Sequence, residues 1–397
     1  MKNHVSSLRN HMEMLCKKIG ARPTGSAKNR AALEYASAVF QKSGFLTSKQ
    51  EFDCIDWINS GAALRIDCKN IPVVPAEYSL ACDIEAEFVC IESAAALRGA
   101  ELSGKIAVLY GGLCQEPLMP KNFEFWNPDE HRQIIALLEE KNPRAIITVS
   151  PQEDSPVHII QDGDFNIPCA AACGNVLETF LQCAGRKAGL TINTQRIPAK
   201  AHNVIATYGT GRDKLCFSAH IDTKPATPGA LDNASGVSVL LALAESLADV
   251  KTGKEFPFQI EFVLLNGEDY YSVPGEMVYM RQLNPAYILA INVDGIGLKE
   301  SKTSVSFYEC SEELENRIIE SVKTTTGIEI IEPWPMGDHM VFVNEGIPAI
   351  AITACNIFSL IDSVIHTNDD DMKNIDMDIL NNITCFLLNC IEQRVFA

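Results

Sequence analysis

The sequence predicts an α/β fold in which a mixed, mostly parallel sheet is sandwiched by helices and is interrupted by an inserted strand-rich domain. Two observations lead to this prediction. From residue 197 onward, apolar strand-like runs alternate with segments of helical periodicity, a pattern typical of helices on both faces of a parallel sheet. Between residues 54 and 196, short alternating segments are separated by turn residues. Residues 1–53 and 197–397 are therefore predicted to form one discontinuous sheet domain, and residues 54–196 a separate inserted one.

The residues before the insertion predict two helices and a strand. Apolar side chains recur at helical spacing from Val5 to Ile19 and again from Ala27 to Ser43. The turn GARPTGS separates these helices, and LTSKQEF is strand-like. Within the insertion, one helix is predicted at Glu130–Lys141. The strands predicted there are 63–68, 86–91, 104–111, 144–150 and 167–173.

After the insertion, strands and helices alternate to the end of the chain. The predicted strands are 203–208, 214–220, 258–267, 287–297 and 348–353. The predicted helices are 236–249, 274–283, 312–325 and 377–393. We expect the polar residues that follow these strands to gather at one edge of the sheet, because α/β folds bind ligands at the carboxyl ends of their strands.

Composition excludes several kinds of partner. The formal net charge of −18 argues against nucleic acid and anionic membranes, since both require clustered Lys and Arg. No run of about 20 apolar residues predicts a membrane span, and the amino terminus lacks a secretory signal pattern. The fourteen cysteines are scattered without a C-x-x-C pair. Reduced thiols and a cytoplasmic location are expected, while the sequence leaves a homo-oligomer open.

Polar clusters follow apolar runs at four places, each expected to be the end of a strand, and contain the types of side chain that bind divalent metals. Two imidazoles and several carboxylates would hold two cations, with one carboxylate bridging them. Zinc is favoured by the histidines, and cobalt or manganese would also fit an oxygen-rich set. The first place contributes His220 and Asp222, with Asp232 in the loop that follows them, and the other three contribute Glu268 and Asp269, Asp294, and His366.

Each of these residues also has a plain structural explanation. A single histidine at a strand end is often a satisfied polar residue, and Asp232 before a helix could be an N-cap. The joint occurrence of all the clusters favours the metal interpretation. The run 369–371 is interpreted as solvated surface with a helix-capping role. The remaining histidines (His4, His11, His131 and His158) are assigned to surface or packing, and the loop with Trp334 and Met336 either shapes a side-chain pocket or is only structural.

Five short motifs resemble the signature set of the co-catalytic zinc aminopeptidases, the peptidase family that includes aminopeptidase Y, glutamate carboxypeptidase II and the glutaminyl cyclases. They are H-I-D at 220–222, D-N-A-S-G at 232–236, G-E-D at 267–269, V-D-G at 293–295 and H-T-N-D-D at 366–370. GARPTGS, G-D-H at 337–339 and G-I-P at 346–348 extend the resemblance. The insertion resembles a protease-associated domain at LSGKIAVL and IPCAAA.

The resemblance implies a role for each residue. Asp232 would bridge two zinc ions, with His220 and Asp294 completing one site and Asp269 and His366 the other. Glu268 would be the general base that takes a proton from the activated water and passes it to the leaving amine. Asp222 would hydrogen-bond the ring of His220. Asp338 and His339 are expected to support the ligands, and the Asp232–Asn233 peptide bond is expected to be cis.

Three positions depart from the family pattern. Asp269 stands where relatives often have Glu, so a single-metal enzyme is an alternative. Ile365 replaces a Tyr that can stabilise the oxyanion, and Gly337 replaces a Ser.

The predicted function is a metal-dependent exopeptidase, an aminopeptidase acting on peptides, with the insertion as a lid or a wall that selects substrates. The alternatives are a glutaminyl-cyclase-like acyl transferase and a non-catalytic binding protein on the same scaffold.

Overall fold

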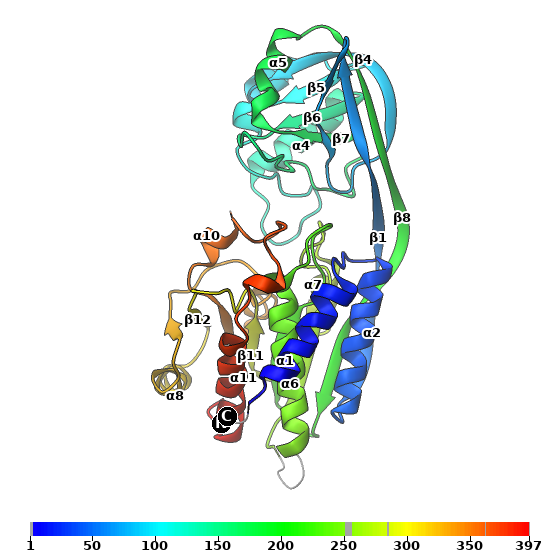
Figure 1. Cartoon of the computed structure of the whole chain (residues 1–397). Coiled ribbons are helices and arrows are strands. Elements are labelled where there is room, and N and C mark those ends of the chain that lie inside the picture. Colours follow the sequence, from blue (N-terminus) through cyan, green and yellow to red (C-terminus); the bar gives the residue numbers. More distant parts are fainter. Residues whose placement is uncertain (1–2, 251–255, 284–285, 362, 397) are drawn as a thin grey trace. The chain divides into compact units, whose positions relative to one another are not determined.

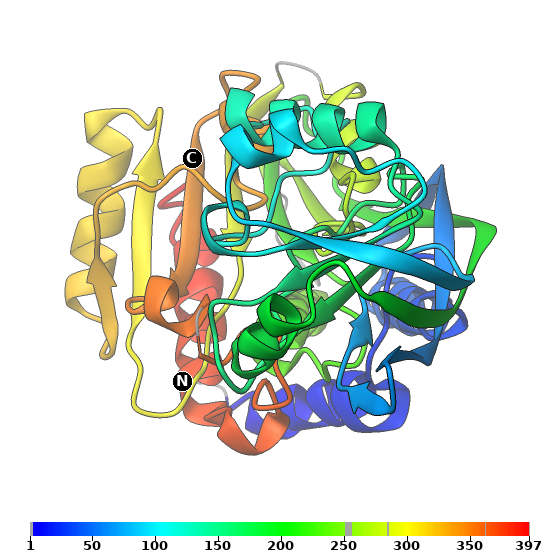
Figure 2. The same cartoon turned by 90° about the horizontal axis from the view of Figure 1, so that it is seen from above.

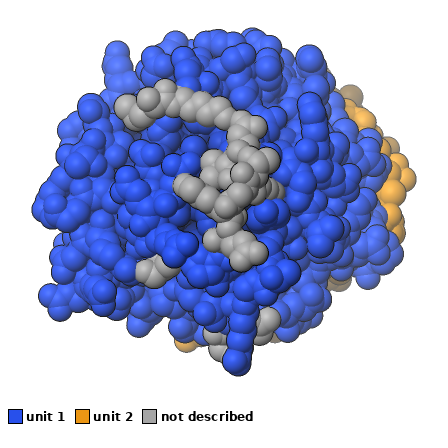
Figure 3. Space-filling model, turned by 90° about the horizontal axis from the view of Figure 1, so that it is seen from below, with its two compact units in different colours: residues 1–54, 199–397 blue, residues 55–198 orange. Residues whose placement is uncertain are grey.

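The computed structural model describes residues 3–250, 256–283, 286–361 and 363–396 (Figure 1). It divides the chain into two compact units, Met1–Cys54 with Ala199–Ala397 and Ile55–Pro198 (Figure 3). The sequence predicts these boundaries after residues 53 and 196. Two long strands, β1 (Leu46–Ile66) and β8 (Lys187–Tyr208), carry residues of both units.

The first unit contains a mixed, mostly parallel sheet, as predicted. Its strand order is β13-β12-β14-β11-β9-β10-β8. Strands β14, β11, β9 and β10 run parallel to one another, while β8 and β12 are antiparallel to their neighbours β10 and β14. The bounds are β9 Lys214–His220, β10 Gln259–Leu265, β11 Tyr287–Val293, β12 Thr303–Tyr308, β13 Ile328–Ile330 and β14 Ala349–Ala354.

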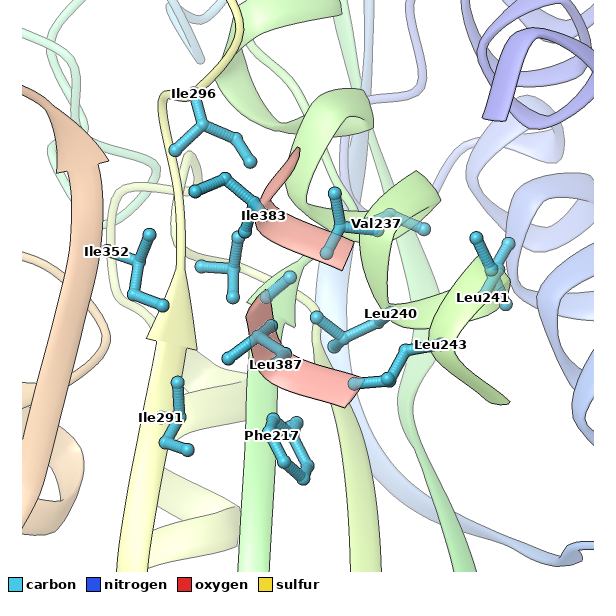
Figure 4. Packing of buried hydrophobic residues seen from close by; sticks show 14 of the residues in the cluster. Phe217, Val237, Leu240, Leu241, Leu243, Ile291, Ile296, Ile352, Ile383 and Leu387 are labelled. Atoms are coloured by element: carbon cyan, nitrogen blue, oxygen red, sulfur yellow. The ribbon is translucent and has the colours of Figure 1, made fainter. Parts of the chain in front are cut away.

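One face of this sheet is covered by long helices that share an apolar core with it. Phe262 of β10 stacks between Phe40 and Phe217, with 5.4 Å between ring centroids on each side. Figure 4 shows side chains of α6 and α11 beside those of β9, β11 and β14. The helices on this face are α1 (Val5–Met12), its continuation η1 (Glu13–Ile19), α2 (Ala27–Lys42), α6 (Ser235–Val250) and α11 (Met377–Glu392).

The opposite face is covered by shorter helices, α7 (Pro274–Met280) and α9 (Met340–Val343). Because side chains alternate along a strand, Glu261 of β10 points away from Phe262 and toward α7, where it accepts hydrogen bonds from Tyr279 (2.7 Å) and Tyr287 (2.6 Å). Phe342 of α9 packs against both tyrosine rings. The prediction of helices on both faces is confirmed.

Strands β12 and β13 were not predicted from the sequence. They lie at one edge of the sheet beside α8 (Glu312–Lys323), on the left in Figure 2. Strand β12 alternates apolar residues with Ser304 and Ser306, which are nevertheless buried. The buried hydroxyl of Ser304 donates a hydrogen bond to the carbonyl of Thr353 (3.0 Å), which satisfies its polar group. Buried hydroxyls and a three-residue β13 leave little hydrophobic signal in the sequence.

The second unit has its own sheet, with β8, β4 (Cys82–Ile91), β5 (Ile106–Leu109), β6 (Ala145–Val149), β7 (Cys169–Ala172) and β3 (Val74–Pro75) side by side. Strand β2 (Lys69–Ile71) pairs with β1. The four residues of β5 contribute alternately to two apolar clusters, so both faces of this sheet are covered. The helices are α3 (Ala94–Gly99), α4 (Asp129–Lys141) and α5 (Leu177–Gln182).

None of the fourteen cysteines, all of which lie in the described ranges, forms a disulfide, and seven of them are buried. Among the helices in the described ranges, none combines the length and apolar character needed to cross a lipid bilayer.

Candidate metal centre

Three parallel strands deliver candidate ligands to one edge of the sheet. His220 is the last residue of β9, and its register partner on β10 is Leu265, three residues before Glu268. Asp294 follows the last residue of β11, whose Asn292 pairs with Ser218 of β9. The carboxyl ends of β9, β10 and β11 therefore bring the imidazole and the acidic residues together, as predicted.

Asp232 lies between β9 and α6, in the short segment η4 (Ala230–Ala234). Its backbone is not helical, and the Asp232–Asn233 bond is cis, as the resemblance predicts. The side chain that caps α6 is not Asp232 but Asn233, which accepts a hydrogen bond from the Gly236 amide (2.9 Å). A Cβ at Gly236 would lie 2.2 Å from the Val293 carbonyl, so only glycine fits there. Asp232 is thus left available to the centre.

His366 does not follow a strand, contrary to the prediction. The apolar run before it forms the short helix α10 (Ile357–Ile361) and a turn, in which the Ile365 amide donates to the Leu360 carbonyl (2.9 Å). His366 itself has a positive φ of 62°. Apolar periodicity cannot distinguish a short buried strand from a short helix, which explains the error.

The carboxylate of Asp232 lies between the two imidazoles. Its Oδ1 is 2.8 Å from Nε2 of His220, and its Oδ2 is 3.1 Å from Nε2 of His366. A further acid lies near the same nitrogen of each ring: Asp294 Oδ2 is 3.6 Å from Nε2 of His220, and Asp269 Oδ1 is 2.8 Å from Nε2 of His366. The structure therefore contains two ligand groups that share Asp232, each with its candidate atoms within 4.8 Å of one another.

Glu268 lies beside these groups and is half-buried. A carboxylate oxygen of Glu268 lies within 4.8 Å of candidate atoms of His220 and Asp269. Burial, together with the nearby negative charge of Asp269 and Asp232, raises the pKa of Glu268 well above its usual value. A carboxylate that readily accepts a proton is what a general base requires.

The charges at the centre fit divalent cations. Burial alone would lower the pKa of His220, but the carboxylates of Asp294 and Asp222 raise it well above its usual value. Burial would also lower the pKa of His366, but the carboxylates of Asp269 and Asp232 raise it well above its usual value. Asp269 Oδ2 is buried without a hydrogen-bond donor among the described residues. A bound cation would replace the proton on each imidazole, and imidazole nitrogens with buried carboxylates match the ligand preference of zinc, so the donor set fits two such ions.

Asp222 makes contacts other than the one predicted. Its Oδ1 is 3.6 Å from Nδ1 of His220, which is too long for a hydrogen bond. It accepts shorter hydrogen bonds from the hydroxyl of Thr24 (2.8 Å) and the amides of Gly267 (2.9 Å) and Asp269 (3.2 Å). Asp222 faces His220, but its hydrogen bonds hold the turn that carries the acids after β10.

Two residues that support the centre were missed by the sequence reasoning. Asp370 was interpreted as solvated surface, yet it is buried and accepts hydrogen bonds from the amides of Leu231 (2.5 Å) and Asp232 (3.2 Å). Arg22 is fully buried and donates to the carbonyls of Ile221 (2.6 Å), Pro228 (3.0 Å) and Gly229 (3.1 Å). The sequence signal for Arg22 was its place in the motif GARPTGS. Asp369, the neighbour of Asp370, is exposed as predicted.

The remaining candidates lie around the centre or away from it. Asp338 is buried, and burial together with Glu276 raises its pKa. His339 Nε2 donates a hydrogen bond to the Trp334 carbonyl (3.2 Å), and its ring packs on Tyr308, so the ring is held by the loop. The Tyr308 hydroxyl donates to the same carbonyl (2.9 Å). His4 and His11 are buried in the first unit and are not among the candidate ligands, and His131 and His158 belong to the second unit.

The fold and site define a class of protein: an α/β domain with a candidate two-cation centre at the carboxyl ends of parallel strands. Residues 203–391 match the sequence model of Peptidase family M28, and this part of the chain belongs to that family.

The chain is also similar to a known relative and to several solved structures. The chain is 28% identical to Aminopeptidase YwaD of Bacillus subtilis (strain 168) over 193 residues, which are 46% of this chain and only 41% of that protein. An aminopeptidase from Aneurinibacillus sp. strain AM-1 superposes with a TM-score of 0.74 at 20% identity, covering 98% of this chain and 93% of the other. A zinc aminopeptidase from Bacillus subtilis gives 0.76 at 16% identity, with 98% and 94% covered.

A glutaminyl cyclase from Porphyromonas gingivalis has a lower TM-score of 0.54 at 16% identity, with 99% of both chains covered. At these identities the structural similarities establish the fold alone.

Proposed function

We propose that this protein is a metal-dependent exopeptidase that removes amino-terminal residues from peptides, with zinc as the metal. The observation that carries the proposal is the position of Asp232, whose two carboxylate oxygens face His220 and His366. An acid whose two oxygens each lie beside a different imidazole is suited to bridge a pair of cations. The names of the relatives support the same activity.

Five residues would hold the metals. His220, Asp232 and Asp294 would bind one zinc, and Asp232, Asp269 and His366 the other. When bound, the ions supply Lewis acidity, which polarises the scissile carbonyl and lowers the pKa of water. Cobalt or manganese would fit the same donors.

Glu268 would handle the proton during hydrolysis. It would take a proton from the attacking water as the new carbon–oxygen bond forms, and then pass it to the amine nitrogen as the carbon–nitrogen bond breaks. Its raised pKa, caused by burial and the neighbouring acids, supports this role. The acidic surroundings also favour a substrate that arrives with a free ammonium group.

Two alternatives are less well supported. A glutaminyl-cyclase-like transferase would need a single zinc, whereas this chain provides two complete ligand groups. A non-catalytic binding protein would not be expected to keep Glu268 beside the ligands. We also propose that the second unit is a protease-associated-like domain that helps select substrates. We further propose that the protein is cytoplasmic, which fits fourteen cysteines that form no disulfide. Recovery of the protein outside the cytoplasm after cell fractionation would contradict this location.

The proposed activity can be tested with one panel of substrates. Aminoacyl anilides, amino-blocked peptides, carboxyl-blocked peptides and a glutaminyl peptide would be incubated with the protein, with and without a chelator. We expect hydrolysis of substrates with a free amino end only, loss of activity with chelator and recovery on adding zinc. Cyclisation of the glutaminyl peptide without anilide hydrolysis would favour the transferase, and no reaction with any substrate would favour a binding protein.

A further inference from the structure

The position of Asp269 raises the question of how a short side chain reaches its place in the centre. Asp has one carbon fewer than Glu between its main chain and its carboxylate. The Asp269 carboxylate nevertheless lies 2.8 Å from Nε2 of His366 and shares a ligand group with Asp232. Its main chain must therefore be held close to the centre.

Two side chains hold that main chain from both ends of the residue. Lys224 Nζ donates a hydrogen bond to the Asp269 carbonyl (2.9 Å). Asp222 accepts from the Asp269 amide (3.2 Å) and from the Gly267 amide (2.9 Å). Both side chains come from the segment 221–224, which follows β9 directly.

This segment is itself firmly anchored. The Ile221 amide donates to the Leu265 carbonyl at the end of β10 (2.9 Å), and its carbonyl accepts from Arg22 Nε (2.6 Å). The Thr223 hydroxyl accepts from the Arg22 amide (2.9 Å). A side chain on an anchored segment can fix the position of another loop, whereas one on a loose segment could only follow it.

We propose that Lys224 is a positioning residue which, together with Asp222, holds the Asp269 main chain at the distance that an aspartate ligand requires. The inference rests on the proposed function, because it concerns the second of the two cation groups. It has a specific consequence. A longer glutamate at position 269 fits poorly while Lys224 holds the main chain, and fits better once Lys224 is removed.

The test compares zinc binding by Lys224→Met, Asp269→Glu and the double variant. Metal-free protein is titrated with zinc in competition with a coloured chelator. Residues that orient a ligand typically contribute about 10- to 100-fold to metal affinity. Each single variant is therefore expected to bind the zinc at Asp232, Asp269 and His366 at least about tenfold less tightly. The double variant is expected to bind it more tightly than either single variant.

Two controls separate this effect from general disruption. Lys141→Met removes a lysine that also donates to a backbone carbonyl, that of Ala100 (2.9 Å), but in the second unit, and it should not change zinc affinity. Lys224→Arg keeps a charged donor and should stay within a fewfold of the unchanged protein. Circular dichroism and thermal unfolding of the metal-free variants show whether each is folded; if Lys224→Met is not, Lys224→Gln replaces it.

The inference is overturned if Lys224→Met binds two zinc ions normally, or if the losses of the two single variants simply multiply in the double variant. Failure of the unchanged protein to bind zinc would instead remove the proposed function, so the two failures can be told apart.

Discussion

Glu268 and Asp269 are neighbours in the chain, yet their carboxylates have different surroundings. Asp269 is buried and lies 2.8 Å from a histidine nitrogen, whereas Glu268 is half-buried at the margin of the ligand groups. Adjacent residues in this turn can therefore divide the work, one binding metal and the other moving a proton.

Glu268→Ala and Glu268→Gln should retain zinc and lose turnover. Removing a general base typically costs about 10²- to 10⁴-fold in rate, and neither change removes a ligand. Zinc content is measured by elemental analysis and kcat with the best anilide of the panel. Near-normal turnover in either variant would contradict the assignment of the base.

Glu276, on α7, is a buried acid that the proposed reaction does not use. Neither of its carboxylate oxygens has a hydrogen-bond partner within the described part of the chain. Burial and the neighbouring Asp222 raise the pKa of Glu276 from 4.5 to about 8. The folded protein therefore holds the proton of the Glu276 carboxyl group more tightly than the unfolded chain does. As the pH rises from about 4.5 to 8, this residue lowers the free energy of unfolding.

Glu276→Gln should therefore stabilise the metal-free protein at pH 8.5 and have little effect near pH 4.5. The gain is at most about 5 kcal/mol, the free energy that corresponds to the raised pKa. Urea unfolding at several pH values measures it, with the exposed Glu313→Gln as control. An advantage that is the same at both pH values would contradict this account.

At the scale of elements, the loop that contains Asp370 supports the segment that contains Asp232. The carboxylate of Asp370 accepts hydrogen bonds from the backbone amides of Leu231 and of Asp232 itself. The 366–370 stretch thus contributes twice to the centre, once through the imidazole of His366 and once through this contact with the main chain.

Asp370→Asn should weaken zinc binding and lower stability by about 1–3 kcal/mol, because an amide offers one acceptor oxygen where two backbone amides need partners. Asp369→Asn, at the exposed neighbour, is the matched control and should change neither property. Chelator competition and thermal unfolding provide the two measurements. Equal behaviour of the two variants would show that the contact has no role.

The sequence predicted the elements that carry strong apolar periodicity and missed those that depend on polar contacts. Strands β9, β10 and β11 were found because their buried runs end abruptly in acids or histidine. Strand β12 was missed because its buried serines resemble a loop. Asp370 was missed for a related reason, since the partners that make its burial possible lie about 140 residues earlier in the chain and cannot be read from local sequence.

At the scale of the whole molecule, the candidate ligands come from residues 220 to 366 and join segments that are far apart in the chain. A metal that binds all of them binds the folded state and not the unfolded one. Zinc should therefore raise the unfolding temperature, and free zinc at about 100 times its dissociation constant adds about 2.7 kcal/mol of stability. Differential scanning calorimetry with and without chelator measures the change in unfolding temperature. An unfolding temperature that does not depend on zinc would contradict zinc binding by these residues.

The central claim is that five side chains bind two zinc ions with Asp232 between them. Diffraction data from crystals grown with zinc, collected on both sides of the zinc absorption edge, test it most directly. The account predicts two anomalous peaks, one next to His220 and Asp294 and one next to Asp269 and His366, with Asp232 contacting both. No peak at these residues, or zinc bound elsewhere in the protein, would contradict it.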